Sequence, residues 1–161
     1  MVKKNMNRNT AIKDKPIVLL SIDKKWADEI LTGHKVYEYR RQSPSLEPPY
    51  IVLLYATSDT SAIVGTFKTQ NVIEDSINNL IKQTIKYTPH KSEEIQLYFE
   101  GKETGSAIQV NSFIKYDDPV TLEKLQSIDE EFSVPQNFRY LRPEKDKKLI
   151  QELPYNGVPI F

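Results

Sequence analysis

The chain has 161 residues, enough for one domain with a buried core, and its 22 basic and 22 acidic residues cancel to a formal net charge of zero. It has no cysteine and only two histidines, which excludes disulfides and cysteine-based chemistry and argues against a multi-histidine metal site. The neutral balance disfavours non-specific coating of duplex DNA but is compatible with a local nucleotide pocket. No apolar run is long enough to span a bilayer, so we expect a cytoplasmic protein with no membrane partner.

The N-terminal residues 1–15 are polar and basic, and we expect a flexible tail. A second interpretation is an arm that contacts phosphate through Lys3, Lys4, Arg8 and Lys13. Residues 16–22 are a short apolar run that predicts a buried strand. An amphipathic helix follows, capped by Ser21 or Asp23 and ended by Gly33.

Strand patterns dominate the next part of the chain. Residues 35–41 predict a second strand, and a loop with three prolines extends over 42–49. The run 50–56 is aromatic and β-branched, which is typical of a central strand. Residues 62–72 predict a further strand, in which Gly65 indicates a bulge or a close backbone approach.

Helical periodicity then interrupts the strands. Residues 76–87 and 92–100 predict two helices that form an insertion. Residues 106–116 alternate as a strand, which Asp117-Asp118-Pro119 is expected to end, and a short helix is predicted over 121–128.

The last part of the chain carries a weaker pattern. Residues 132–141 predict an irregular aromatic segment, and a charged run over 144–148 leads into a proline-containing tail. The order of elements is not the alternation of a doubly wound sheet, and no glycine-rich phosphate loop is present. We therefore predict an α+β fold, a small mixed β-barrel flanked by helices. Its parts are a flexible basic tail (1–15), a domain (16–141) with a helical insertion over about 76–101, and a C-terminal extension (142–161).

The densest group of chemically active side chains lies in the second strand, in the sequence GHKVYEYRR from Gly33 to Arg41. Strand alternation places Val36, Glu38 and Arg40 on one face. The other face then carries Lys35, Tyr37, Tyr39 and Arg41. Glu38 and Arg40 either pair with each other or converge on a ligand.

The pattern G-x-K-x-x-E-x-R formed by Gly33, Lys35, Glu38 and Arg40 resembles the signature of the ASCH domain (activating-signal-cointegrator homology), a relative of PUA-like RNA-binding domains. Flanking segments extend the resemblance over about residues 16–141, namely Ser21-Ile22, Ile30-Leu31, 54–58, 62–65 and 135–141. It implies a PUA-like β-barrel with a cleft beside the signature strand. It also implies a cofactor-free protein that binds RNA or a nucleotide, as a regulator linked to transcription or translation.

The same resemblance implies a second interpretation as an enzyme. Some small members resemble amidohydrolases that act on acetylated cytidine, with a catalytic signature lysine and a threonine where this chain has Glu38. That difference removes the hydroxyl nucleophile from its expected place. Lys35 and Glu38 are therefore expected to be catalytic only if the protein is a metal-independent hydrolase of a modified nucleoside. Glu74 is a guess for the third catalytic residue. A protein-interaction module that uses the two-helix insertion as its surface is a third interpretation.

For the binding interpretation, Lys35 and Arg40 would hold phosphate and Glu38 would accept from a base edge. The full predicted ligand-binding set is Lys35, Glu38, Arg40, Arg41, Thr57, Ser58, Gln136, Arg139 and Tyr140. Each has a plainer interpretation: a solvated lysine, an internal ion pair, a surface arginine, turn chemistry or an aromatic loop that covers a barrel end. Trp26, Tyr37 and Tyr39 are expected in the core, and His34 is expected to be exposed.

Overall fold

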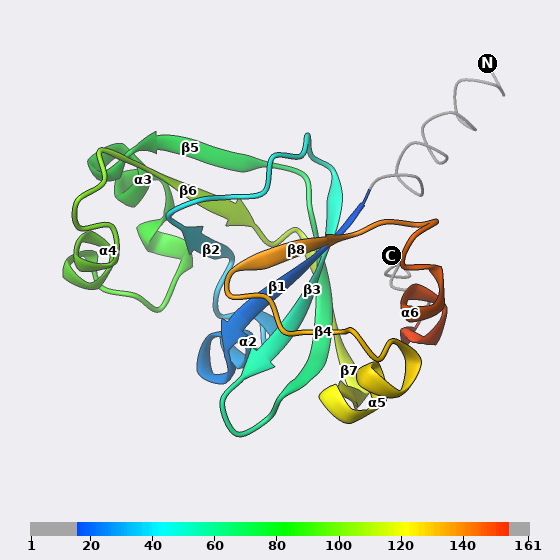
Figure 1. Cartoon of the computed structure of the whole chain (residues 1–161). Helices are drawn as coiled ribbons and strands as arrows, with labels where there is room; N and C mark the ends of the chain where they lie inside the picture. The colour runs from blue at the N-terminus through cyan, green and yellow to red at the C-terminus, as the bar shows by residue number, and fades with distance from the viewer. Residues whose placement is uncertain (1–15, 155–161) are drawn as a thin grey trace, which may run out of the picture.

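The computed structural model describes residues 16–154, so the predicted basic tail and residues 155–161 lie outside the described residues. The described chain has an α+β fold, as predicted, with a five-stranded and a three-stranded β-sheet (Figure 1). In chain order the elements are β1 (Ile17–Asp23), α2 (Lys24–Leu31), β2 (Tyr37–Arg40), β3 (Tyr50–Thr57), β4 (Ala62–Thr69), β5 (Val72–Ser76), α3 (Ile77–Thr84), the single-turn helix η1 (Ile85–Tyr87), α4 (Ser92–Tyr98), β6 (Thr104–Gln109), β7 (Ser112–Thr121), α5 (Leu122–Ile128), β8 (Phe138–Leu141) and α6 (Lys147–Glu152). The strand pairs among residues 16–154 form two sheets, with no closed ring of strands.

The larger sheet has the order β7-β4-β3-β1-β8, with β1 parallel to β3 and every other neighbouring pair antiparallel. Its central strands are continuous apolar runs because both faces are covered. Leu19 and Leu53 pack in a cluster with residues of α5 and α6, whereas Leu20 and Leu54 pack in another with residues of α2. Burying each such side chain contributes about 1.5–3 kcal/mol, so these strands anchor the fold.

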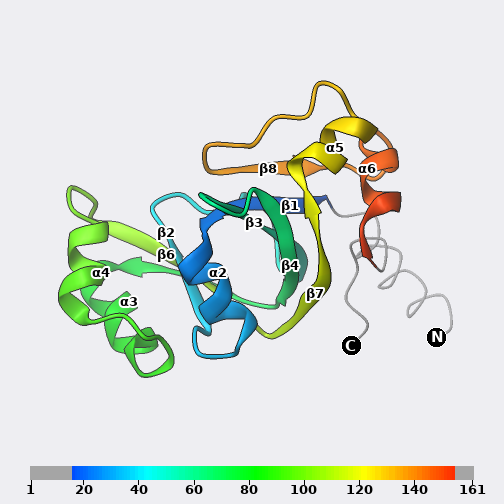
Figure 2. The same ribbon diagram turned by 90° about the horizontal axis from the view of Figure 1, so that it is seen from below.

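The smaller sheet has the order β2-β6-β5, and α3 and α4 cover it. Tyr37 and Tyr39 are buried in its core, as predicted, together with Leu80, Ile95 and Phe99. Figure 2 shows α2 within the curve of β1, β3 and β4, with the α3–α4 lobe on the opposite side of the molecule from α5 and α6. The chain between β4 and β7 thus builds a separate lobe beside the larger sheet.

Two of the predicted strands are each divided into two separate strands in the structure. Residues 62–72 divide into β4 and the start of β5, and residues 106–116 divide into β6 and the start of β7. In both cases the chain passes from one sheet to the other, which alternation of side chains does not reveal. The predicted close approach at Gly65 is confirmed, because an added Cβ would lie 2.6 Å from the Ile114 carbonyl oxygen.

Three other predictions at the end of the chain were wrong. The segment 117–119 does not end its strand, since β7 continues to Thr121. Of the segment 132–141, residues 132–137 are irregular, but 138–141 form β8, which pairs with β1. The charged run leads into α6, whose Leu149 is buried. Tertiary pairing and packing override the weak local pattern there.

Candidate functional site

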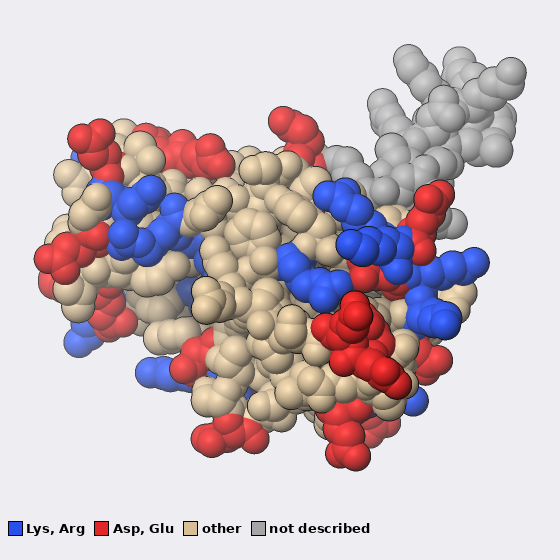
Figure 3. All heavy atoms as spheres, viewed as in Figure 1, with Lys and Arg blue, Asp and Glu red and all other residues tan. Residues whose placement is uncertain are grey.

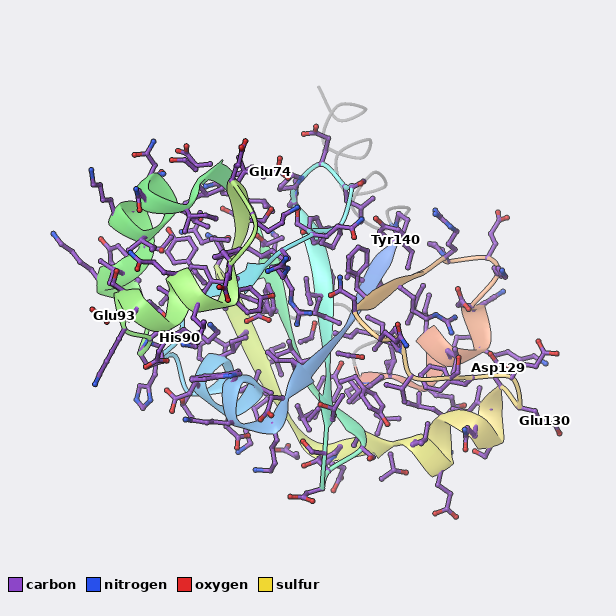
Figure 4. The ribbon with its side chains drawn as sticks, turned by 60° about the vertical axis from the view of Figure 1, so that its left-hand side comes forward. Glu74, His90, Glu93, Asp129, Glu130 and Tyr140 are labelled. Carbon is purple, nitrogen blue, oxygen red and sulfur yellow. The ribbon has the colours of Figure 1, made fainter. Side chains whose placement is uncertain are left out.

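A cleft of about 370 Å³ opens where the two sheets approach each other. Its lining comes from the end of β1, from α2, from the signature strand β2 and from the segment that includes α4: Ser21, Ile22, Asp23, Trp26, Lys35, Glu38, Tyr39, Arg40, His90, Glu94, Ile95 and Tyr98. Figure 4 places His90 between the α3–α4 lobe and α2. The signature residues therefore form one wall of a cleft, and a loop from the distant lobe forms another.

The turn after α2 positions the signature lysine. Asp23 caps the helix by accepting a hydrogen bond from the Lys25 amide at 3.0 Å, and Gly33 ends it with a φ of +84°, which favours glycine. The amides of His34 and Lys35 both donate to the Glu29 carbonyl oxygen at 3.0 Å. This arrangement leaves His34 exposed, as predicted, and directs Lys35 inward.

Lys35 is only 2% exposed, so its interpretation as a solvated lysine was wrong. Its Nζ lies 2.7 Å from Nε2 of His90 and 3.5 Å from Oε1 of Glu38, and it sits over the Tyr39 ring at 4.9 Å. Alternation had placed Lys35 and Glu38 on opposite faces, but Lys35 precedes β2 and its long side chain reaches Glu38. Burial lowers the pKa of Lys35, and the charge of Glu38 partly opposes that shift.

Arg40 contacts residues of both sheets. Its Nε and Nη2 lie 2.9 and 2.8 Å from Oε2 of Glu38, its Nη1 donates to Asn137 Oδ1 at 2.8 Å, and its Nη2 donates to the Ser21 carbonyl oxygen at 2.8 Å. Glu38 and Arg40 are thus an ion pair and also line the cleft, so the two interpretations from the sequence coexist. These contacts with described residues engage Nε, Nη1 and Nη2 of the guanidinium, so Arg40 is held in place beside the cleft.

His90 lies on the wall that the α3–α4 lobe contributes and was not predicted as a site residue. Its ring packs on Trp26 with centroids 4.1 Å apart, and its Nδ1 lies 3.5 Å from Oε2 of Glu94. Burial and the neighbouring Lys35 cation lower the pKa of His90, which favours the neutral ring. With Lys35 as the donor, Nε2 accepts and the ring proton lies on Nδ1, toward Glu94.

The other predicted binding residues lie outside the cleft lining. Arg41 is exposed and bonds to carbonyl oxygens at the end of α4, and Gln136 is exposed. Thr57 donates to the Ile22 carbonyl oxygen at 3.2 Å, and Ser58 occupies a turn with a φ of +50°. The role of these four residues in ligand binding stays a prediction.

Three more predicted residues are engaged elsewhere. Arg139 pairs with Asp146 at 2.9 Å, and the Tyr140 hydroxyl accepts from the Ser45 amide at 2.9 Å. Glu74, the guess for a third catalytic group, accepts from Ser43 at 3.2 Å, and Figure 4 shows it well apart from His90. The structure therefore groups Lys35, Glu38 and Arg40 only.

Sequence reasoning missed Trp26, His90, Tyr98 and Asn137. Trp26 was expected in the core, yet its half-buried ring lines the cleft. Arg40 reaches Asn137, which is 97 residues away in the chain. No local pattern links such distant residues.

Within the described part of the chain, no cluster of three or more potential metal-ligating side chains exists. No helix among residues 16–154 is long and apolar enough to cross a membrane.

The fold and the signature wall define an ASCH-type domain, and comparison with known proteins agrees. Residues 20–114 match the ASCH domain family, so the chain belongs to that family. An ASCH domain-containing ribonuclease of Zymomonas mobilis is 26% identical over 141 residues, which is 88% of this chain and 95% of the relative.

Solved structures lead to the same family. A crystal structure of a single-residue variant of the Zymomonas mobilis ASCH protein superposes with a TM-score of 0.77 at 25% identity, covering 86% of this chain and 96% of that one. The N-terminal domain of Staphylothermus marinus McrB shares the fold, with a TM-score of 0.55 at 13% identity and coverage of 84% and 93%.

Proposed function

We propose that this protein binds RNA in the cleft and cleaves its phosphodiester backbone. The supporting similarity is the Zymomonas mobilis relative, which is named a ribonuclease and matches over nearly its whole length. The observation that carries the proposal is the 2.7 Å contact between Lys35 Nζ and His90 Nε2. It sets a buried cation and a neutral imidazole side by side in a cleft that also holds Arg40.

This pair suits cleavage of RNA by its own 2′-hydroxyl. The reaction removes a proton from that hydroxyl and accumulates negative charge on the phosphate oxygens. His90 accepts the proton at Nε2 once the Lys35 ammonium turns to the phosphate, and the positive charge of Arg40 in the cleft lining stabilises the same negative charge. The 2′-oxygen bonds to phosphorus, the bond to the 5′-oxygen breaks, and that oxygen takes a proton from water. The hydroxide left by that water takes the proton from His90, which restores the neutral ring.

The cleft has an acidic rim and a basic floor. Asp23 and Glu94 at the rim are exposed, so water and salt screen their charges. On the buried floor, Lys35 and Arg40 face the single carboxylate of Glu38, which leaves one positive charge in excess. A bound phosphodiester supplies a negative charge that balances the excess positive charge of this floor.

The test is cleavage of a labelled, unstructured RNA oligomer by purified protein, with magnesium, with manganese and with a chelator in parallel. We expect Lys35→Met and His90→Ala to lower the cleavage rate by at least about 10²-fold. Lys124→Met, which removes an exposed charge on α5, is the matched control and should cleave as the wild type does. Cleavage by both cleft variants at the wild-type rate would overturn the proposal.

Hydrolysis of an acylated nucleoside is a second candidate. The observation that favours it is the buried amine of Lys35, whose lowered pKa suits a nucleophile or a base, 3.5 Å from Glu38. Release of acetate from acetylated cytidine, lost in Lys35→Met, would support it. The predicted link to transcription or translation control stays a prediction, on which the geometry of the cleft does not bear.

A further inference from the structure

Tyr98 is a large aromatic side chain that is partly exposed in the cleft. It lies at the end of α4, lines the cleft and is 43% exposed. Its ring meets Phe99 edge to face with centroids 4.9 Å apart, and Phe99 is itself 1% exposed in the core of the lobe. The ring is therefore anchored by a buried neighbour and still presents aromatic surface.

Arg41, which follows the last signature residue Arg40, fixes this end of α4. Its Nη1 donates to the carbonyl oxygens of Tyr98 at 3.0 Å and Glu100 at 2.9 Å. The last carbonyls of a helix have no partner within the helix and carry partial negative charge, so a guanidinium is well suited to them. The short segment that supplies Lys35 and Arg40 thus also positions Tyr98.

The cleft combines aromatic and cationic groups. Trp26 and His90 pack together in its lining, and Lys35 and Arg40 lie on its floor. Tyr98 lines this cleft together with Arg40, and burial raises the pKa of its phenol while the charge of Arg40 opposes that shift. Aromatic side chains beside backbone-binding cations are the recurring means of binding single-stranded nucleic acid.

We propose that Tyr98 is a stacking wall for one unpaired nucleobase of the RNA, and that Arg41 is the residue that positions this wall. This inference rests on the proposed function and adds a substrate preference to it. A base inside a duplex is already stacked on its neighbours, so it reaches the ring only after unpairing. Single-stranded RNA is therefore the preferred ligand over the same strand in a duplex.

The experiment measures Kd by fluorescence anisotropy for a labelled single-stranded RNA oligomer and for its duplex. Loss of one stacked base predicts a Kd about 5- to 100-fold higher in Tyr98→Ala, with Tyr98→Phe close to the wild type. Leu97→Ala is the matched control, because Leu97 precedes Tyr98 on α4 and is 70% exposed but does not line the cleft. Its Kd should equal that of the wild type.

A double-mutant cycle tests the part played by Arg41. Arg41→Ala should raise Kd in the wild type but add nothing in Tyr98→Ala, because its effect passes through the ring. A merely structural role would give additive effects and a parallel loss of Tm.

Wild-type protein that binds and cleaves RNA while Tyr98→Ala binds it equally well would overturn the stacking wall alone. Wild-type protein that neither binds nor cleaves RNA would overturn the proposed function as well.

Discussion

Residues 16–154 contain two arginine–carboxylate pairs with a buried carboxylate, one in the cleft and one beside α6. Arg40 lies 2.8 Å from Glu38 and Arg139 lies 2.9 Å from Asp146, and both carboxylate side chains are 8% exposed. The two pairs differ in their remaining partners. The second oxygen of Asp146 accepts from the Arg142 amide at 2.8 Å and closes the turn before α6, whereas that of Glu38 faces a second cation, Lys35.

The balance of charges around the two pairs differs as well. The hollow beside α6 is lined by three carboxylates and three lysines, namely Asp129, Glu144, Asp146, Lys145, Lys147 and Lys148. Figure 3 shows acidic and basic side chains interleaved over this end of the molecule. The floor of the cleft instead has two cations for one anion. Burial of charge alone therefore does not distinguish the two pairs, whereas the excess of buried positive charge in the cleft does.

The largest expected effect comes from removing the shared carboxylate. Glu38→Gln leaves the Lys35 and Arg40 cations buried without their counter-charge, so we expect the free energy of unfolding to fall by about 3–5 kcal/mol. Asp146→Asn should lower it less, because Arg139 is 30% exposed and can turn to water. Urea unfolding measures both variants, and equal losses would contradict the distinction between the two pairs.

The second prediction separates function from stability. Lys35→Met should abolish RNA cleavage yet keep the free energy of unfolding within about 1 kcal/mol of the wild type, because it removes a desolvated amine and leaves Glu38 paired with Arg40. Arg139→Met should do the reverse, since it leaves Asp146 without its cation at a distance from the cleft. Cleavage and urea unfolding assays on the same preparations test this. A loss above about 2 kcal/mol in Lys35→Met would contradict it.

The smallest predicted effect is a dependence of stability on pH. The pKa of His90 is lowered from 6.5 in the folded protein, so just below pH 6.5 the unfolded chain binds a proton that the folded chain does not. Lowering the pH through this range therefore favours unfolding. The free energy of unfolding of the wild type, relative to His90→Gln, should fall from neutral to mildly acidic pH in urea titrations. A difference that is constant with pH would show that His90 titrates normally.

The strongest sequence signals gave the correct fold. The runs 16–22 and 50–56 are β1 and β3, at the centre of the larger sheet, because a strand covered on both faces is apolar throughout. The division of 62–72 and of 106–116 was not predictable, since a strand that changes sheets keeps its alternation. Whether a segment such as 138–141 forms an edge strand depends on the distant strand that it meets, β1.

The candidate site was predictable from the sequence only where its residues lie close together in the chain. Lys35, Glu38 and Arg40 lie within one short segment, and a recurring spacing identifies them together. Lys35 and His90 are separated by 55 positions, and only the packing of the α3–α4 lobe against α2 brings them into contact. Side-chain type alone placed Trp26 in the core, because an apolar helix face does not reveal a cleft above it.

The chain leaves the larger sheet after β4 and returns to it at β7, and this single excursion has a consequence for how the protein can diversify. It contributes His90 and Tyr98 to the cleft, whereas Lys35, Glu38 and Arg40 come from the segment before it. Changes in α3 and α4 therefore alter the shape and chemistry of one half of the site while the charged half and the central strands stay as they are. Selectivity can evolve, or be engineered, within one contiguous stretch of sequence.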